Sequence, residues 1–214
     1  IAPFRPIFGL RDKTLGLAGV WQIAPFRPIF GLRDKTLGLA GFGNIARAVA
    51  YRAKAFGIHV QGYDPFVSEE IFEQEGVKQA SWESLLQTSD MISIHLPLHA
   101  STRHVFNKMA LEQMRSHAVL INTSRGGVIE ETDLYHALKS KRIAGAALDV
   151  TEEEPLSLES PLLKLDNCII TSHCAWYSEE SMARLQRFAA LEISRLFSGE
   201  LPKHIVNGKE IAMR

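Results

Sequence analysis

Three side chains with complementary chemistry each follow a short apolar stretch that is typical of a buried β-strand. They are Arg125, Glu154 and His173, and each belongs to a different loop. An arginine can hold a carboxylate through two parallel hydrogen bonds. A histidine beside a glutamate can stay protonated near neutral pH, donate that proton as a general acid and take it back as a base. Each residue alone could be structural, but the three together predict an active site at one edge of a sheet.

A glycine turn in the first half of the chain predicts a dinucleotide-binding site. The segment Leu37–Ala40 has the pattern of a short buried strand, Gly41 and Gly43 mark a tight turn, and helical spacing begins at Asn44. Gly41 permits the sharp turn, Gly43 lets the backbone approach a pyrophosphate, and the small Ala46 lets the helix lie near the strand. The N–H groups at the start of this helix favour a phosphate.

An acidic residue lies where such sites place their ribose-binding carboxylate. Asp64 follows Gly43 by about 20 residues, directly after the strand-like segment 59–63. A glycine turn alone also occurs in proteins that bind no nucleotide. The turn combined with this acid favours cofactor binding.

The rest of the sequence alternates short apolar stretches with helical patterns. Strands are expected at 37–40, 59–63, 91–95, 118–121, 146–150 and 168–171, and helices at 44–56, 82–87, 108–114, 131–139 and 178–197. This order predicts an α/β fold with a doubly wound parallel sheet of the Rossmann type, which binds its ligand at the carboxyl ends of the strands. Two helices have apolar faces that are expected to be core: Ile45, Val49, Ala50, Ala53 and Phe56 in the first, and Met182, Leu185, Phe188, Ala189 and Ile193 in the last.

Four stretches of the chain resemble the coenzyme-binding part of the D-isomer-specific 2-hydroxyacid dehydrogenases. The stretches are Gly38–Ala46, Asn122–Gly127, Ala147–Pro155 and Ser172–Trp176, and the resemblance runs from Gly31 to about Asn207. Two stretches, Arg52–Gly57 and His173–Glu179, look most like the C-terminal-binding-protein branch. That branch includes NAD(H)-sensing transcriptional corepressors as well as bacterial dehydrogenase-like proteins.

The resemblance implies a catalytic role for each of the three side chains at the strand ends. Arg125 would bind the substrate carboxylate and polarise the keto oxygen, His173 would transfer the proton, and Glu154 would hold the imidazole and favour its protonated form. Hydride would move between a nicotinamide and C2 of a 2-keto or 2-hydroxy acid. Trp176 would line the substrate pocket with Arg125 and His173.

The resemblance also implies which residues bind the cofactor. Asp149 and Thr123 would orient the nicotinamide, and Asp64 would bind the adenosine ribose. The negative charge of Asp64 repels a 2′-phosphate, so NAD is expected rather than NADP. The full expected set is Gly41, Gly43, Asn44, Ile45, Asp64, Pro97, Thr102, Thr123, Arg125, Asp149 and His173.

The N-terminal part of the chain contains a duplication. Residues 1–19 are repeated without change as residues 23–41, and only the second copy continues into the glycine turn. We therefore expect residues 1–22 to lie outside the core and residues 23–197 to form the NAD-binding domain. Members of the family begin with a substrate-binding domain, which this chain largely lacks. We expect an N-terminally truncated enzyme whose segment 198–214 would return to that absent domain.

Composition and charge exclude several other classes of protein. The 24 basic residues equal the 24 acidic ones, so no basic surface for nucleic acid is expected. Apolar stretches are shorter than a membrane span, and the two cysteines lack a metal or redox spacing, which favours a cytoplasmic protein with reduced thiols. His95, His99 and His104 are expected to be exposed imidazoles of a cofactor-side loop, so no metal site is predicted.

Two alternatives to a dehydrogenase remain open at this point. One is an NAD(H)-sensing interaction protein whose output is dimerisation, and the other is a poorly folding fragment that aggregates through exposed apolar segments. The resemblance implies a homodimer formed through the coenzyme-binding domains. A small 2-keto or 2-hydroxy acid is the expected substrate.

Overall fold

The computed structural model describes residues 31–203 and residue 205. The chain divides after His173 into two compact units, and each unit is described by itself. The expectations for residues 1–22, and for most of the C-terminal segment, concern residues outside the described part. The domain limits at residues 22 and 197 stay predictions.

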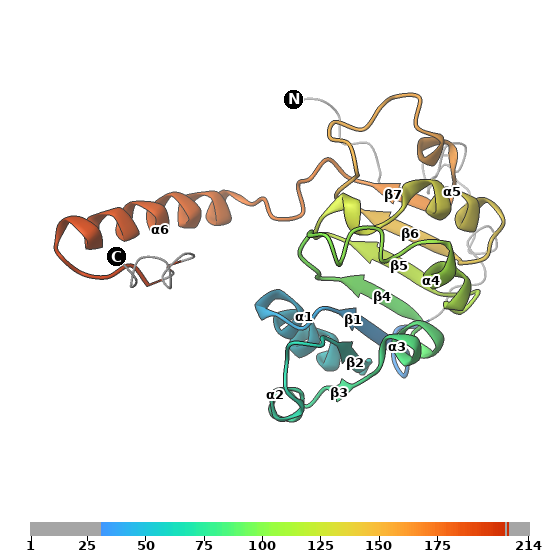
Figure 1. The fold of residues 1–214 in the computed structure, drawn as a ribbon, viewed down its shortest axis with the longest axis horizontal. Coiled ribbons are helices and arrows are strands. Elements are labelled where there is room, and N and C mark those ends of the chain that lie inside the picture. The colour runs from blue at the N-terminus through green and yellow to red at the C-terminus, as the bar shows by residue number, and fades with distance from the viewer. Residues whose placement is uncertain (1–30, 204, 206–214) are drawn as a thin grey trace, which may run out of the picture. The chain divides into compact units, whose positions relative to one another are not determined.

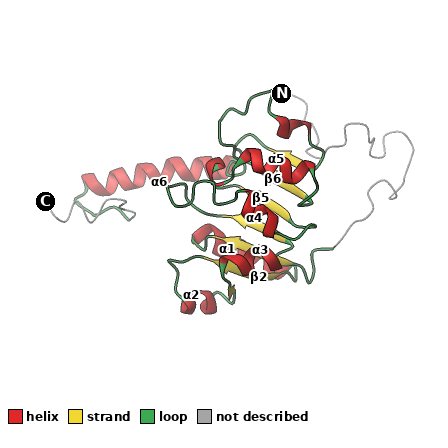
Figure 2. Cartoon of the chain, turned by 45° about the vertical axis from the view of Figure 1, so that its right-hand side comes forward, coloured by secondary structure: helices red, strands yellow, loops and turns green. Residues whose placement is uncertain are grey.

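The first unit is built around one parallel sheet (Figures 1 and 2). Its strands are β1 (Thr36–Ala40), β2 (His59–Tyr63), β3 (Lys78–Gln79), β4 (Met91–Ile94), β5 (Val119–Asn122), β6 (Gly145–Leu148) and β7 (Cys168–Ile170). The strands lie in the order β3-β2-β1-β4-β5-β6-β7, and every neighbouring pair is parallel. The chain reverses direction across the sheet between β1 and β4, where doubly wound folds bind dinucleotides.

Helices cover the sheet through two separate cores. They are α1 (Asn44–Ala55), α2 (Glu69–Gln74), α3 (Trp82–Thr88), α4 (Lys108–Gln113) and α5 (Glu131–Lys139), with 3-10 helices η2 (Gly126–Val128) and η3 (Pro161–Lys164). On β1, Leu37 and Leu39 pack into the core that holds α1 and Phe72 of α2, whereas Ala40 packs into the core of α3, α4 and α5. Because side chains alternate along a strand, the two cores lie on opposite faces of the sheet, which confirms the doubly wound fold.

Four of the observed elements were not predicted, namely β3, α2 and the 3-10 helices η2 and η3, and all four are short. The strand β3 has two residues, Lys78 and Gln79, both exposed, and α2 buries only Phe72. Elements of this length leave almost no periodic signal in the sequence. The other expected strands and helices of the first unit are present with ends shifted by one or two residues.

The expected core face of α1 was partly wrong. The buried residues of this helix are Ala46, Ala50 and Ala53, whereas Ile45 is 70% exposed and Phe56 is 65% exposed. Small side chains face the sheet because the helix lies close to β1 and β2. The bulkier Ile45 is therefore left at the surface, in the first turn after the glycine turn.

The second unit contains one long helix, α6 (Glu179–Phe197), whose first turn is capped by reciprocal hydrogen bonds between Ser178 and Ser181. The sequence predicted that its apolar stripe is core, but Leu185 is 58% exposed and Phe188 is 56% exposed. Among the described residues of its own unit, α6 is the one helix and no strand lies beside it. None of the described helices is long and apolar enough to cross a membrane.

Candidate functional site

The glycine turn joins the end of β1 to the start of α1. Gly41 has a φ of +91°, and a Cβ at this position would lie 2.8 Å from the His95 carbonyl oxygen, so only glycine fits here. At Gly43, the N-cap of α1, an added Cβ would meet nothing within 4 Å. The start of α1 has no side-chain cap, so its first N–H groups are available to a ligand. The turn therefore combines a fixed backbone with open space in front of a helix N-terminus.

Asp64 lies directly beside this turn, one residue after β2. Its Oδ2 accepts a hydrogen bond from the Phe42 N–H at 2.9 Å, and its Oδ1 accepts one from the Phe66 N–H at 2.9 Å. Both bonds hold the carboxylate at the carboxyl end of β2. The structure thus brings together the turn and the acid that the sequence paired, as a ribose-binding role requires. Asn44 and Ile45, also expected at the cofactor, form the exposed first turn of α1.

The loop after β4 approaches the same edge of the sheet. Thr102 Oγ1 donates to the Pro97 carbonyl at 2.6 Å and accepts from the His99 N–H at 3.0 Å, which folds the loop back on itself. His95 at the start of this loop is mostly buried, contrary to its expected exposure. Burial lowers the pKa of His95 to about 4, so the ring is neutral, and its Nε2 lies 3.0 Å from Ser93 Oγ.

His173 and Glu154 form a hydrogen-bonded pair at the ends of β7 and β6. The His173 Nδ1 lies 2.7 Å from Glu154 Oε2, and both side chains are about half exposed. The bond from His173 lowers the pKa of Glu154; burial opposes this shift, and a bond from the Thr151 N–H adds to it. The carboxylate therefore stays charged and fixes the orientation of the ring.

Asp149 is the buried member of this group. It follows β6, is 5% exposed, and accepts a hydrogen bond from Thr171 Oγ1 at 2.5 Å. Its carbonyl accepts from the His173 N–H at 2.8 Å. Asp149, Glu154 and His173 line one hollow of about 400 Å³, whose apolar wall is formed by Leu156, Leu158, Leu163 and Ile170.

Arg125 lies at the end of β5, which is the strand next to β6. Its backbone is held by Asn122, whose Nδ2 donates to the Arg125 carbonyl at 2.9 Å, and its side chain is exposed. At Gly126, a Cβ would lie 1.9 Å from the Thr151 carbonyl oxygen, so the segment after Arg125 packs directly against the loop that carries Glu154. Thr123, also expected at the cofactor, is exposed at the same strand end. Since β5, β6 and β7 are parallel neighbours, the three predicted catalytic residues share one edge.

Trp176 belongs to the second unit. Its side chain is 49% exposed and packs edge-to-face with Tyr177 at a centroid distance of 5.6 Å. Its role in the substrate pocket stays a prediction. Among the described residues, Cys168 in β7 and Cys174 take part in no disulfide.

The three histidines weighed as metal ligands do not come together. His95 contacts Ser93 and His99 contacts Ser101, whereas His104 lies between Glu130 and Glu152. Among the described residues, His104, Glu130 and Glu152 place one possible ligand atom each within 4.8 Å of one another. Local spacing carries no signal for this group, because its members lie far apart in the sequence.

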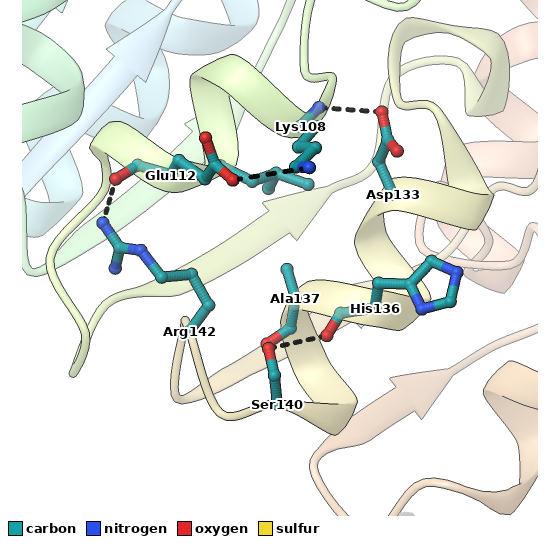
Figure 3. A pocket seen from close by; sticks show the side chains of 8 residues that line it. Lys108, Glu112, Asp133, His136, Ala137, Ser140 and Arg142 are labelled. Carbon is teal, nitrogen blue, oxygen red and sulfur yellow. Dashed lines mark hydrogen bonds and ion pairs between the residues drawn. The ribbon is translucent and has the colours of Figure 1, made fainter.

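A second hollow, of about 360 Å³, lies between α4 and α5 (Figure 3). Its charged side chains bind one another or the adjacent backbone. Lys108 Nζ lies 3.9 Å from Glu112, the Lys108 N–H donates to Asp133 at 2.8 Å, and Arg142 donates to the Glu112 carbonyl. The charges here join the two helices and are not directed toward a ligand.

Comparison with known proteins points to the same family that the sequence motifs resemble. A family model described as "D-isomer specific 2-hydroxyacid dehydrogenase, NAD binding domain" matches residues 4–175. A glyoxylate reductase of Korarchaeum cryptofilum is 40% identical over 172 residues, which cover 80% of this chain and 52% of that protein. A D-3-phosphoglycerate dehydrogenase of Methanocaldococcus jannaschii is 40% identical over 166 residues, covering 77% of this chain and 32% of that protein.

Solved structures give the same result. The acyclic imino acid reductase Bsp5, in complex with NADPH and D-Arg, superposes with a TM-score of 0.78 at 33% identity, covering 88% of this chain and 59% of that chain. A D-lactate dehydrogenase with NAD+ from Lactobacillus jensenii superposes with a TM-score of 0.74 at 29% identity. The match covers 81% of this chain and 56% of that chain. The chain thus spans between about a third and a half of the curated relatives described above. It belongs to the D-isomer-specific 2-hydroxyacid dehydrogenase family, through that family's NAD-binding domain.

Proposed function

We propose that this chain is the coenzyme-binding part of an NAD-dependent dehydrogenase that interconverts a 2-keto acid and a 2-hydroxy acid. The observation that carries the proposal is the 2.7 Å pair of His173 and Glu154 at the same sheet edge as the glycine turn. An acid–base histidine at the sheet edge that carries the nucleotide turn is what this reaction requires. The names of the relatives, which are reductases and dehydrogenases, favour an enzyme over an interaction protein.

The residues of the turn fit a dinucleotide. The space in front of Gly43 admits a pyrophosphate to the N–H groups of α1, and the Asp64 carboxylate at the end of β2 can accept hydrogen bonds from ribose hydroxyls. A 2′-phosphate would meet the negative charge of Asp64, which favours NAD over NADP. When bound, the nicotinamide supplies or accepts the hydride.

The side chains at the strand ends account for the remaining steps. Arg125 binds the substrate carboxylate through its guanidinium and polarises the keto oxygen. In reduction, the keto carbon gains a hydride and its oxygen gains a proton from His173 Nε2. Glu154 stabilises the imidazolium before that transfer. In oxidation, the same histidine takes the hydroxyl proton back as a base.

Several finer expectations belong to this proposal. The partner in catalysis is a small 2-keto or 2-hydroxy acid, and two copies pair through their coenzyme-binding domains. A cytoplasmic location and placement in the C-terminal-binding-protein branch likewise stay predictions. The balanced charge of the chain supports the absence of a nucleic-acid partner.

The role of Arg125 can be tested by separating its charge from its geometry. Arg125→Lys keeps the positive charge but loses the two-pronged bond, so the KM for glyoxylate should rise about tenfold or more while NADH affinity is unchanged. Arg125→Ala should lose most of the remaining turnover. Steady-state kinetics and an NADH titration measure the two effects. Unchanged kinetics in both variants would contradict the assignment.

A further inference from the structure

His104 is held between two carboxylates from other loops. Its Nδ1 lies 3.1 Å from Glu130 Oε2, and its Nε2 lies 2.8 Å from Glu152 Oε1. All three side chains are about 70% buried. The backbone of His104 has a φ of +52°, a left-handed conformation that asparagine and glycine also tolerate. The ring therefore bridges two segments that are distant in sequence.

Each of these carboxylates belongs to a segment that carries a predicted catalytic residue. Glu130 caps α5 and lies two residues after η2, which begins directly after Arg125. Glu152 lies two residues before Glu154, and its N–H donates to Glu131 Oε1 at 2.5 Å. His104 itself lies two residues after Thr102, in the loop expected at the cofactor. The His104 ring thus joins three segments: its own loop, the segment after Arg125 and the loop that carries Glu154.

Backbone contacts tie the same three segments together. The His104 N–H donates to the Gly127 carbonyl at 2.9 Å, and the Phe106 N–H donates to the Val128 carbonyl at 3.1 Å. The loop at Thr151 approaches so closely that Gly126 has no room for a side chain. A shift of the loop around Glu152 would therefore be passed on to Glu154.

Several carboxylates gather around this ring. Glu130, Glu131 and Glu152 lie together, and burial raises the pKa of Glu131, with the charge of Glu152 adding to the effect. His104 faces two of these carboxylates, and Arg103 Nη2 lies 2.5 Å from Glu152 Oε1. Without the ring, the two loops would lose the contacts that join Glu130 to Glu152.

The arrangement does not suit a metal ion. The two nitrogens of His104 lie on different sides of the ring and bind different carboxylates. Arg103 Nη2 and His104 Nε2 both contact Oε1 of Glu152. The Arg103 guanidinium thus already supplies a positive charge beside that carboxylate.

We propose that His104 is a positioning residue that holds Glu154 in register with His173 by fixing Glu152 and Glu130. The proposal rests on the proposed function, since it concerns the same acid–base pair. It assigns His104 no contact with substrate or cofactor.

The test follows the His173 ring in the free chain by proton–nitrogen NMR of the assigned histidine side chains. In His104→Asn, which tolerates the left-handed backbone, and in the isosteric Glu152→Gln, the signals of His173 should shift as its bond to Glu154 weakens. The matched control is His136→Asn, on α5 at the edge of the second hollow (Figure 3), which should leave His173 unchanged. Amide spectra establish that each variant is folded.

The outcomes separate this proposal from the proposed function. His173 signals that are identical in the parent chain, His104→Asn and Glu152→Gln would overturn the positioning role. If His104→Asn does not fold, Glu152→Gln and Glu130→Gln decide the question, because they remove the same bonds without changing the strained residue. Failure of the parent chain to bind NADH would instead count against the proposed function, since the NMR signature needs no ligand.

Discussion

The sheet has an amino edge, at which its parallel strands begin, and a carboxyl edge, at which they end. The two edges carry similar polar residues but use them differently. At the amino edge, Lys54, His59, Lys78 and Arg115 line a hollow of about 570 Å³. Lys54 donates to the Glu75 carbonyl at the end of α2, and Arg115 Nε donates to the Gln87 carbonyl in the last turn of α3 at 3.1 Å. These cations close helix C-termini, where positive charge is favourable.

At the carboxyl edge the polar groups are held by the backbone and directed toward open space. The uncapped start of α1, the turn at Gly43, and the paired His173 and Glu154 are all accessible. The difference follows from the common direction of the strands, because parallel strands with crossover helices place helix N-termini at one edge and C-termini at the other. A cluster of charges is therefore informative only together with the edge at which it lies.

The largest expected effect is a loss of turnover, and it is seen by substituting one histidine at each edge. His173→Gln should lower 2-keto acid reduction by about 10²–10⁴-fold, the usual contribution of a general acid, while NADH affinity is retained. His59→Gln at the amino edge should leave both quantities unchanged. Glyoxylate reduction and NADH titration of the two variants measure this. Equal turnover in His173→Gln and the parent chain would remove the functional distinction between the edges.

A smaller effect, on stability alone, is expected at the amino edge. Asp90 accepts hydrogen bonds from the Thr36 N–H at 2.8 Å, from Arg115 at 3.0 Å and from His117 at 2.7 Å. Partial burial by itself would raise the pKa of Asp90, but these three bonds together lower it below its ordinary value. Asp90→Asn should therefore reduce the free energy of unfolding at neutral pH by about 1–3 kcal/mol.

The pH dependence of this loss has a definite sign. A carboxyl whose pKa is lower in the folded state stabilises the fold above its unfolded pKa, and that stabilisation disappears as the pH falls through the folded pKa. The difference in the free energy of unfolding between the parent chain and Asp90→Asn should therefore be largest at neutral pH and become smaller under acidic conditions. Urea unfolding at several pH values measures this difference. A difference that is independent of pH, or an accompanying loss of NADH affinity, would argue against a purely structural role.

Local spacing was enough to predict the glycine turn, Asp64 and the alternation of strands and helices. Each depends on residues that are close in sequence or on a period that the sequence displays. The pairing of His173 with Glu154 was predictable from residue types once the family resemblance was recognised. Its 2.7 Å geometry depends on β6 and β7 being neighbours, which no local pattern encodes.

Features that depend on contacts between loops were missed. His104 meets Glu130 and Glu152 only because three loops converge, and the His95 ring contacts Ser93 and is largely shielded from water. The apolar pattern of α1 pointed to Ile45 as core, but the close approach of helix and sheet selects alanines instead. Sequence patterns thus identify which residues lie at an edge of the sheet better than they identify the side chains that those residues contact.

The most direct test of the carboxyl edge as the coenzyme site is an NADH titration followed by nicotinamide fluorescence. Gly43→Trp fills the open space in front of α1, and Lys78→Met removes a charge from the hollow at the amino edge. The parent chain and Lys78→Met should bind NADH saturably with the same affinity, and Gly43→Trp should not bind. Undiminished binding in Gly43→Trp, or no binding by the folded parent chain, would contradict the assignment of the coenzyme to this edge.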